Sequence, residues 1–128
     1  MKTYTGSIQS LREAEYFVFG SNTEGRHGKG AALTARKKFG AIYGRSSGFQ
    51  GNSYAIVTKN LLKTSHPSVD MAEIIEQITV LYLAAQDHPD KLFYVAYNGR
   101  NPEARSLNGY TADDMASMFA MANHHIIP

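Results

Sequence analysis

Three short apolar runs stand out along the chain, each bounded by polar or glycine-rich sequence. They lie at residues 16–19 (YFVF), 53–58 (SYAIVT) and 92–96 (LFYVA). Runs without strict alternation of apolar and polar residues are typical of strands covered on both faces, as in a parallel sheet. We therefore expect 16–19, 54–57 and 92–95 to be neighbouring buried strands of one sheet.

The segments between these runs have helical spacing and predict helices at 29–39, 69–85 and 112–120. Gly40 is placed to end the first helix as its C′ residue. Ser68 and Thr111 are well placed to cap the amino ends of the second and third helices.

Strands that alternate with helices predict an α/β fold, here a three-layer α/β/α sandwich whose sheet is mostly parallel or mixed. We expect one domain over residues 1–128, because no linker, repeat or low-complexity tract divides the chain. Residues 126–127 are expected to add a terminal strand. Ligands in such sheets bind beyond the carboxyl ends of the strands, and the glycine-bearing loops are expected to meet at that edge.

The loop after the first strand carries the strongest chemical signal. It is followed at once by an alanine-rich helix and contains Gly20, Gly25, Gly28 and Gly30. Glycines allow close approach of the backbone to a ligand, and the first N–H groups of the helix attract an anion. Arg26, His27 and Lys29 suit a phosphate group. The segment predicts a site for a phosphorylated small molecule, best a nucleotide.

Composition narrows the classes of partner. The net charge of +2 is too small to favour a nucleic-acid partner. Because cysteine is absent and the His124–His125 pair lacks a third ligand, we expect no metal and no cofactor. No apolar run reaches the roughly 18–20 residues that cross a bilayer, and no segment has the pattern of a signal peptide. We expect a cytoplasmic protein without a membrane partner.

The stretch FGSNTEGRHGKGAALTARKKFGAIYGRSSGFQGNSYAIVTK, at 19–59, resembles the ligand-binding region of macrodomains. It is more similar still to small macrodomain-like proteins of phages and bacteria, and the likeness resumes at 92–97, at GYTADDMASMF and at IIP. The resemblance implies an α/β/α fold that binds ADP-ribose or a related nucleotide. Relatives usually carry a compact Gly-Cys-Gly-type loop where this chain has the longer, cysteine-free segment 98–110.

The loop chemistry and the resemblance together select a set of candidate ligand-binding residues. They are Gly20, Ser21, Asn22, Gly25, Arg26, Gly28, Lys29, Gly30, Gln50, Asn52, Asn98, Gly99, Arg100 and Tyr110. We expect a pocket in which 22–30 faces 98–110, while 44–53 closes one side. The resemblance places Asn22 where macrodomain asparagines bond the distal ribose.

Each of these candidates also has a structural interpretation. Asn22 can form an Asx-turn instead of binding a ribose. His27 is a candidate general base or phosphate contact, or else a structural histidine. Gln50 and Asn52 line the pocket or satisfy turn backbone, and Tyr110 stacks on a base or packs in the core.

Three functions stay open at this point. The protein hydrolyses an ADP-ribosyl or phosphate-ester linkage with Asn22 and His27 assisting, or it binds the nucleotide without turnover, as a reader or a sponge for a signal. The third is an RNA or protein interaction module on the same fold. Fold likeness does not decide among them.

Overall fold

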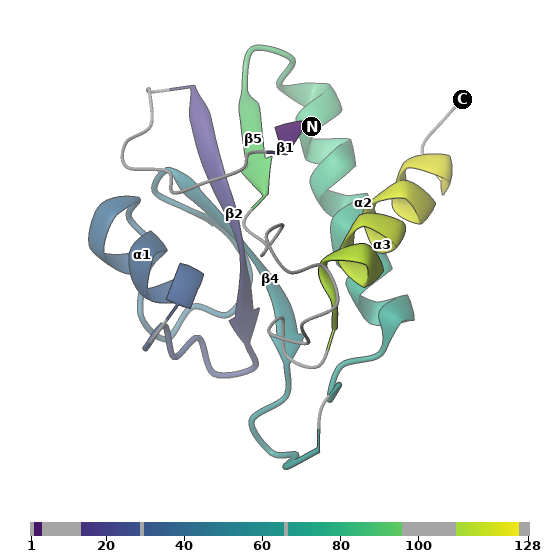
Figure 1. Ribbon diagram of the computed structural model, residues 1–128. Helices are drawn as coiled ribbons and strands as arrows, with labels where there is room; N and C mark the ends of the chain where they lie inside the picture. The colour runs from purple at the N-terminus through teal and green to yellow at the C-terminus, as the bar shows by residue number, and fades with distance from the viewer. Residues whose placement is uncertain (1, 4–13, 29, 66, 96–109, 126–128) are drawn as a thin grey trace.

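The computed structural model describes residues 2–3, 14–28, 30–65, 67–95 and 110–125 of the 128. Within these ranges five strands form one sheet in the order β1-β5-β2-β4-β3 (Figure 1). Their bounds are β1 Lys2–Thr3, β2 Glu15–Asn22, β3 Gly48–Gln50, β4 Ser53–Lys59 and β5 Leu92–Val95.

The three predicted strands are neighbours in this sheet. β2 lies at the centre and pairs in parallel with β5 on one side and with β4 on the other. β1 extends the parallel part beyond β5, whereas β3 pairs with β4 in the antiparallel sense. The prediction of one mixed, mostly parallel sheet built on these runs is therefore confirmed.

Helices lie on both faces of the sheet (Figure 1). α1 (Gly30–Lys38) packs on one face, where Phe17, Phe19 and Ala55 meet Ala35. α2 (Met71–Asp87) and α3 (Ala112–His125) pack on the other, against a larger core. That core contains Val18, Ile56, Ile74, Ile78, Leu81, Phe93, Val95 and Met118. Successive residues of β2 thus serve opposite faces, as the pleat of a strand requires.

The predicted helix ends are partly correct. Gly40 has a φ of 79° just after α1, as expected of a C′ glycine. Thr111 and Asp114 form a reciprocal capping box: the Asp114 N–H donates to Thr111 Oγ1 at 3.0 Å, and the Thr111 N–H donates to Asp114 Oδ2 at 2.8 Å. α3 continues past residue 120, because Ala122 is still fully buried in the larger core.

The prediction that Ser68 caps α2 is wrong. Asp70 is the N-cap residue, and it makes no side-chain capping bond. Ser68 instead accepts a hydrogen bond from the Asn60 N–H at 2.8 Å, while Val69 is buried in the core. Asp70 has an extended backbone conformation, and the helix starts later than its sequence signals suggest.

A side chain of α2 completes the hydrogen bonding of β4. Gln77 Oε1 accepts from the Val57 N–H at 2.7 Å, and Gln77 Nε2 donates to the Val57 carbonyl at 2.9 Å. β3 pairs with residues 53–55 of β4, so it ends before Val57. The glutamine amide takes the place of a neighbouring strand at this position.

Among the described residues, no helix is long and apolar enough to cross a membrane.

Candidate functional site

A pocket of about 340 Å³ lies where β2 and β4 end, at the carboxyl edge of the parallel strands. It is lined by Gly20, Ser21, Asn22, Arg26, Gly28, Ala32, Lys59 and Leu61. The end of β2 and the loop that follows form one wall, the first turn of α1 contributes Ala32, and β4 with its following loop supplies the opposite wall. This is the edge at which ligands bind in open α/β sheets.

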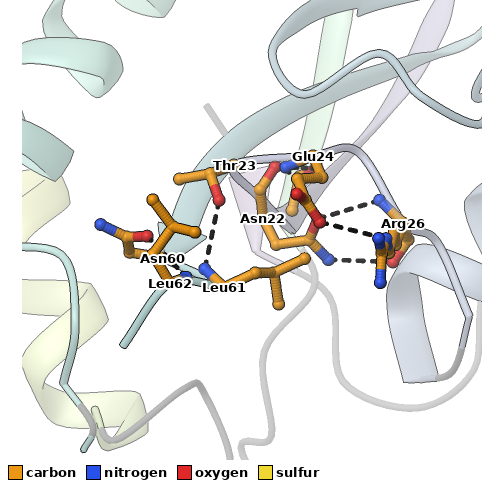
Figure 2. Close-up of polar contacts among 8 residues, drawn as sticks. Asn22, Thr23, Glu24, Arg26, Asn60, Leu61 and Leu62 are labelled. Carbon is orange, nitrogen blue, oxygen red and sulfur yellow. Dashed lines mark hydrogen bonds and ion pairs between the residues drawn. The ribbon is translucent and has the colours of Figure 1, made fainter. Parts of the chain in front are cut away.

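The side chain of Asn22 organises the loop after β2. Its Oδ1 accepts from the Arg26 N–H at 2.9 Å and from the Glu24 N–H at 3.3 Å, and its Nδ2 donates to the Arg26 carbonyl at 2.9 Å (Figure 2). The Gly25 N–H also donates to the Asn22 carbonyl. Both the turn interpretation and a pocket position thus apply to Asn22. Among the contacts of the described residues, one N–H of its amide has no acceptor.

The glycines of this loop have different tasks. Gly25 is buried with a φ of 65°, and a Cβ there would lie 2.5 Å from the backbone nitrogen of Arg45. Gly28 is exposed and lines the pocket, and apart from its chain neighbours no described residue comes within 4 Å of the place a Cβ would take. Gly30 has a φ of 63° and equally open surroundings. Gly25 therefore permits close packing of the chain on itself, while Gly28 leaves open space at the pocket.

His27 is fully buried under the loop and is not among the pocket-lining residues. Its Nε2 lies 3.3 Å from Ser21 Oγ, and its ring meets Phe19 edge-on at 5.3 Å. Nδ1 has no hydrogen-bond partner among the described residues. Burial lowers the pKa of His27, the Arg36 charge lowers it further, and the Arg45 backbone acts in the opposite direction. The imidazole ring is therefore neutral and serves packing. Its link to the pocket is indirect, because it contacts Ser21, which lines the pocket.

The opposite wall comes from the loop after β4, which sequence reasoning missed. The Thr23 N–H donates to the Lys59 carbonyl at 3.0 Å, and the Leu61 N–H donates to Thr23 Oγ1 at 3.1 Å (Figure 2). These bonds join the two loops side by side. A usable signal existed: Lys59 directly follows the predicted strand 53–58, so the carboxyl-edge rule applies to it as it does to Asn22.

Gln50 and Asn52 do not line this pocket, and neither does any other residue of 44–53. Gln50 is buried; its Oε1 accepts from the Ile42 N–H and its Nε2 donates to the Arg45 carbonyl, both at 2.8 Å. Asn52 Nδ2 donates to the Glu15 carbonyl at 3.2 Å, at the start of β2. Because the turn after β3 precedes β4, it belongs to the amino edge of the parallel strands. Here the turn-backbone interpretation describes the observed contacts.

Tyr110 is also a core residue in its observed contacts. It is buried, packs with α2 and α3, and donates its hydroxyl hydrogen to the Val69 carbonyl. Burial raises the pKa of the Tyr110 hydroxyl, and the charges of Asp70 and Asp114 raise it further. It does not line the pocket.

The remaining candidates lie outside the described residues, and they are Lys29, Asn98, Gly99 and Arg100. The expected strand at 126–127 also lies outside them.

The charged side chains that line the pocket are both positive. They are Arg26, on the loop after β2, and Lys59, at the end of β4. Arg26 Nε lies 3.1 Å from Glu24 Oε2, in a solvent-exposed pair that contributes little to stability. No carboxylate and no imidazole lines the pocket among the residues that the structure describes. The charges on the described lining residues therefore favour an anion, although the Glu24 carboxylate beside Arg26 offsets part of them.

Comparison of the chain with protein-family models, with curated proteins and with solved structures finds no match. The fold and the pocket define an α/β protein with a mixed, mostly parallel sheet, three helices in the described ranges, and a cationic hollow at the carboxyl edge. The likeness to macrodomains stays a prediction that rests on the motifs of residues 19–59.

Proposed function

We propose that the pocket binds ADP-ribose or a related phosphorylated nucleotide. The observation that carries this proposal is the convergence of three features in one hollow: the open backbone at Gly28, the first turn of α1, and the cations Arg26 and Lys59. A helix amino end and two positive side chains favour the same kind of group, a phosphate. The macrodomain-like motif of the same loop agrees with this chemistry.

The contacts favour binding without turnover over hydrolysis. A general base has to reach a water molecule beside the bond that breaks. His27 is buried and contacts Ser21 rather than the pocket space, and the Asn22 amide is engaged by its own loop. The described pocket residues therefore supply phosphate and hydroxyl contacts but no accessible base. A nucleotide reader or sponge fits this set of groups better than a hydrolase.

The proposal is tested by melting the protein in the presence of ADP-ribose, NAD, their cyclic derivatives and cyclic oligonucleotides. A ligand at 100 times its dissociation constant stabilises the folded state by about 2.7 kcal/mol, which is a readily measured shift. Calorimetry then gives the affinity, and chromatography of the recovered ligand shows whether it is intact. A protein whose melting no nucleotide alters does not have this function, and an RNA or protein interaction module becomes the better explanation.

A single variant localises the binding. Gly28→Val adds a branched side chain at a position where, among the described residues, a Cβ meets no atom beyond the chain neighbours, so we expect the fold to melt normally and nucleotide affinity to be lost. Ala72→Val, at an exposed position of α2, introduces the same side chain far along the chain and serves as the matched control. Unchanged affinity in folded Gly28→Val would remove the glycine loop from the binding site.

A further inference from the structure

The loop after β4 presents one leucine side chain, that of Leu61, at the pocket. Leu61 lines the pocket, and Leu62 beside it is 88% exposed, more than any other large hydrophobic residue in the described part of the chain. An exposed leucine taken singly needs no explanation. Leu61 gives the cationic hollow an apolar lining residue from the loop after β4, and Leu62, its neighbour in the chain, adds a second exposed apolar side chain to the same turn.

This turn is held in place by hydrogen bonds to its backbone. The Leu61 N–H donates to Thr23 Oγ1, and the Leu62 N–H donates to Asn60 Oδ1 at 2.9 Å (Figure 2). The turn is closed by the Lys63 N–H, which donates to the Asn60 carbonyl at 3.1 Å. Ser68 fixes the Asn60 N–H from the far side of the loop. The leucines are therefore presented by an ordered turn that is tied to the opposite wall.

The pocket has polar and apolar lining residues side by side. Figure 2 shows the Leu61 side chain extending from its loop toward the amide of Asn22. Ala32, on α1, is a second apolar lining residue, whereas Arg26 and Lys59 supply the positive charge. A simple phosphate or a sugar phosphate uses the cations but gains nothing from a leucyl surface. A nucleobase offers both a flat apolar face and hydrogen-bonding edges.

We propose that Leu61 forms a nucleobase subsite, so that the pocket selects nucleotides over sugar phosphates. This inference rests on the proposed function, because it assigns the part of the same ligand that lies away from the phosphate. The base packs on the leucyl side chain and excludes water from it. The N–H of Asn22 that has no acceptor among the described contacts donates to the ribose or to an edge of the base.

The test compares two probes, AMP and ribose 5-phosphate, by calorimetry on the whole protein. We expect the wild type to bind AMP more tightly than ribose 5-phosphate. Leu61→Ala is expected to weaken the binding of AMP about tenfold, because the shortened side chain buries less apolar surface against the base. The affinity for ribose 5-phosphate should stay nearly unchanged. Leu83→Ala, on the exposed side of α2, is the control for loss of a surface leucine. Melting curves confirm that each variant is folded.

The possible failures are distinguishable. If the wild type binds neither AMP nor any nucleotide of the melting panel, the proposed function fails and the subsite fails with it. If a nucleotide of the panel binds but AMP binds no more tightly than ribose 5-phosphate, the subsite alone is overturned. If nucleotides bind but Leu61→Ala binds AMP as the wild type does, the subsite alone is overturned. If Leu61→Ala weakens AMP and ribose 5-phosphate equally, Leu61 shapes the phosphate site and the nucleobase assignment is again overturned.

Discussion

The loop after β2 and the turn between β3 and β4 look alike in sequence but do different work. Both combine glycine with amide side chains, as GSNTEG at 20–25 and QGN at 50–52. The first lines a pocket at the carboxyl edge of the sheet, whereas the second packs against the end of α1. There the Asn52 N–H donates to the Phe39 carbonyl at 2.8 Å, and Gly51 lies against Gly40.

The difference is one of strand direction. A loop that follows a parallel strand emerges at the carboxyl edge, where Asn22 and Lys59 meet. The 51–52 turn joins antiparallel β3 to the start of β4, and so it lies at the amino edge. Glycine and amide content therefore indicates a tight turn, and the direction of the neighbouring strand decides whether that turn can reach a ligand.

The largest effect is expected where a glycine of either loop is packed against backbone. Gly25→Ala and Gly51→Ala combine a left-handed φ with a Cβ less than 3.0 Å from backbone atoms. We expect each to lower the free energy of unfolding by roughly 2–5 kcal/mol, measured by urea denaturation. Gly48→Ala, with a φ of 85° but open surroundings, isolates the conformational part and is expected to lose about 1–2 kcal/mol.

Ligand affinity separates the two loops in the same variants. In the folded fraction, Gly51→Ala should bind nucleotide as the wild type does, because its turn lies at the other edge. Gly25→Ala should bind more weakly, because the loop that carries Arg26 has to move. If Gly51→Ala lost affinity at constant fold, the division between the edges would not hold.

A smaller effect concerns pH, and it belongs to the first loop. The pKa of His27 is lowered from its ordinary 6.5, so the unfolded chain takes up a proton that the folded protein resists. The free energy of unfolding should therefore decrease as pH falls through 6.5, until the lower pKa of the folded state is reached. His27→Gln keeps a polar group near Ser21 without titrating, and its stability should fall less over this range. Parallel curves for the two proteins would contradict this.

The smallest effect is expected at the pocket rim. Arg26→Ala removes an exposed charge whose partner is Glu24, so the melting temperature should hardly change. Nucleotide affinity should fall a few-fold and become less sensitive to salt, because an exposed cation acts through a screened field. Lys37→Ala, on the exposed side of α1, should alter neither quantity. An Arg26→Ala protein with the salt dependence of the wild type would place the phosphate elsewhere.

Local sequence signals predicted the central strands well, because runs such as 54–57 are apolar enough to be buried on both faces. They also predicted that Thr111 caps α3, which depends on a contact between near neighbours in the chain. They failed for Ser68, whose partner is Asn60, and they left two roles open for Gln50, whose observed partners lie in the 42–45 segment. A polar side chain can hydrogen-bond to several backbone groups, and tertiary packing decides which of them it meets. The local capping or turn propensity of a residue does not contain this information.

The pocket residues likewise divide into those that local sequence signals predict and those that depend on long-range packing. Gly20, Asn22 and Gly28 were predicted as site residues because they belong to one continuous glycine-bearing stretch at the end of β2. Lys59 and Leu61 carry no motif, and they enter the pocket because β4 lies beside β2. Pairing partners of a strand are a long-range property, so half of a site at a sheet edge is hidden until the strand order is known.

The clamp that Gln77 places on Val57 has a consequence for assembly. Exposed strand edges invite strands of other chains, in β-augmented complexes or in aggregates. Past the end of β3, the Val57 N–H and carbonyl are already bonded to the glutamine amide, so an incoming strand finds no free ladder position there. A helix side chain thereby protects β4 from edge-to-edge association without the need for a longer β3.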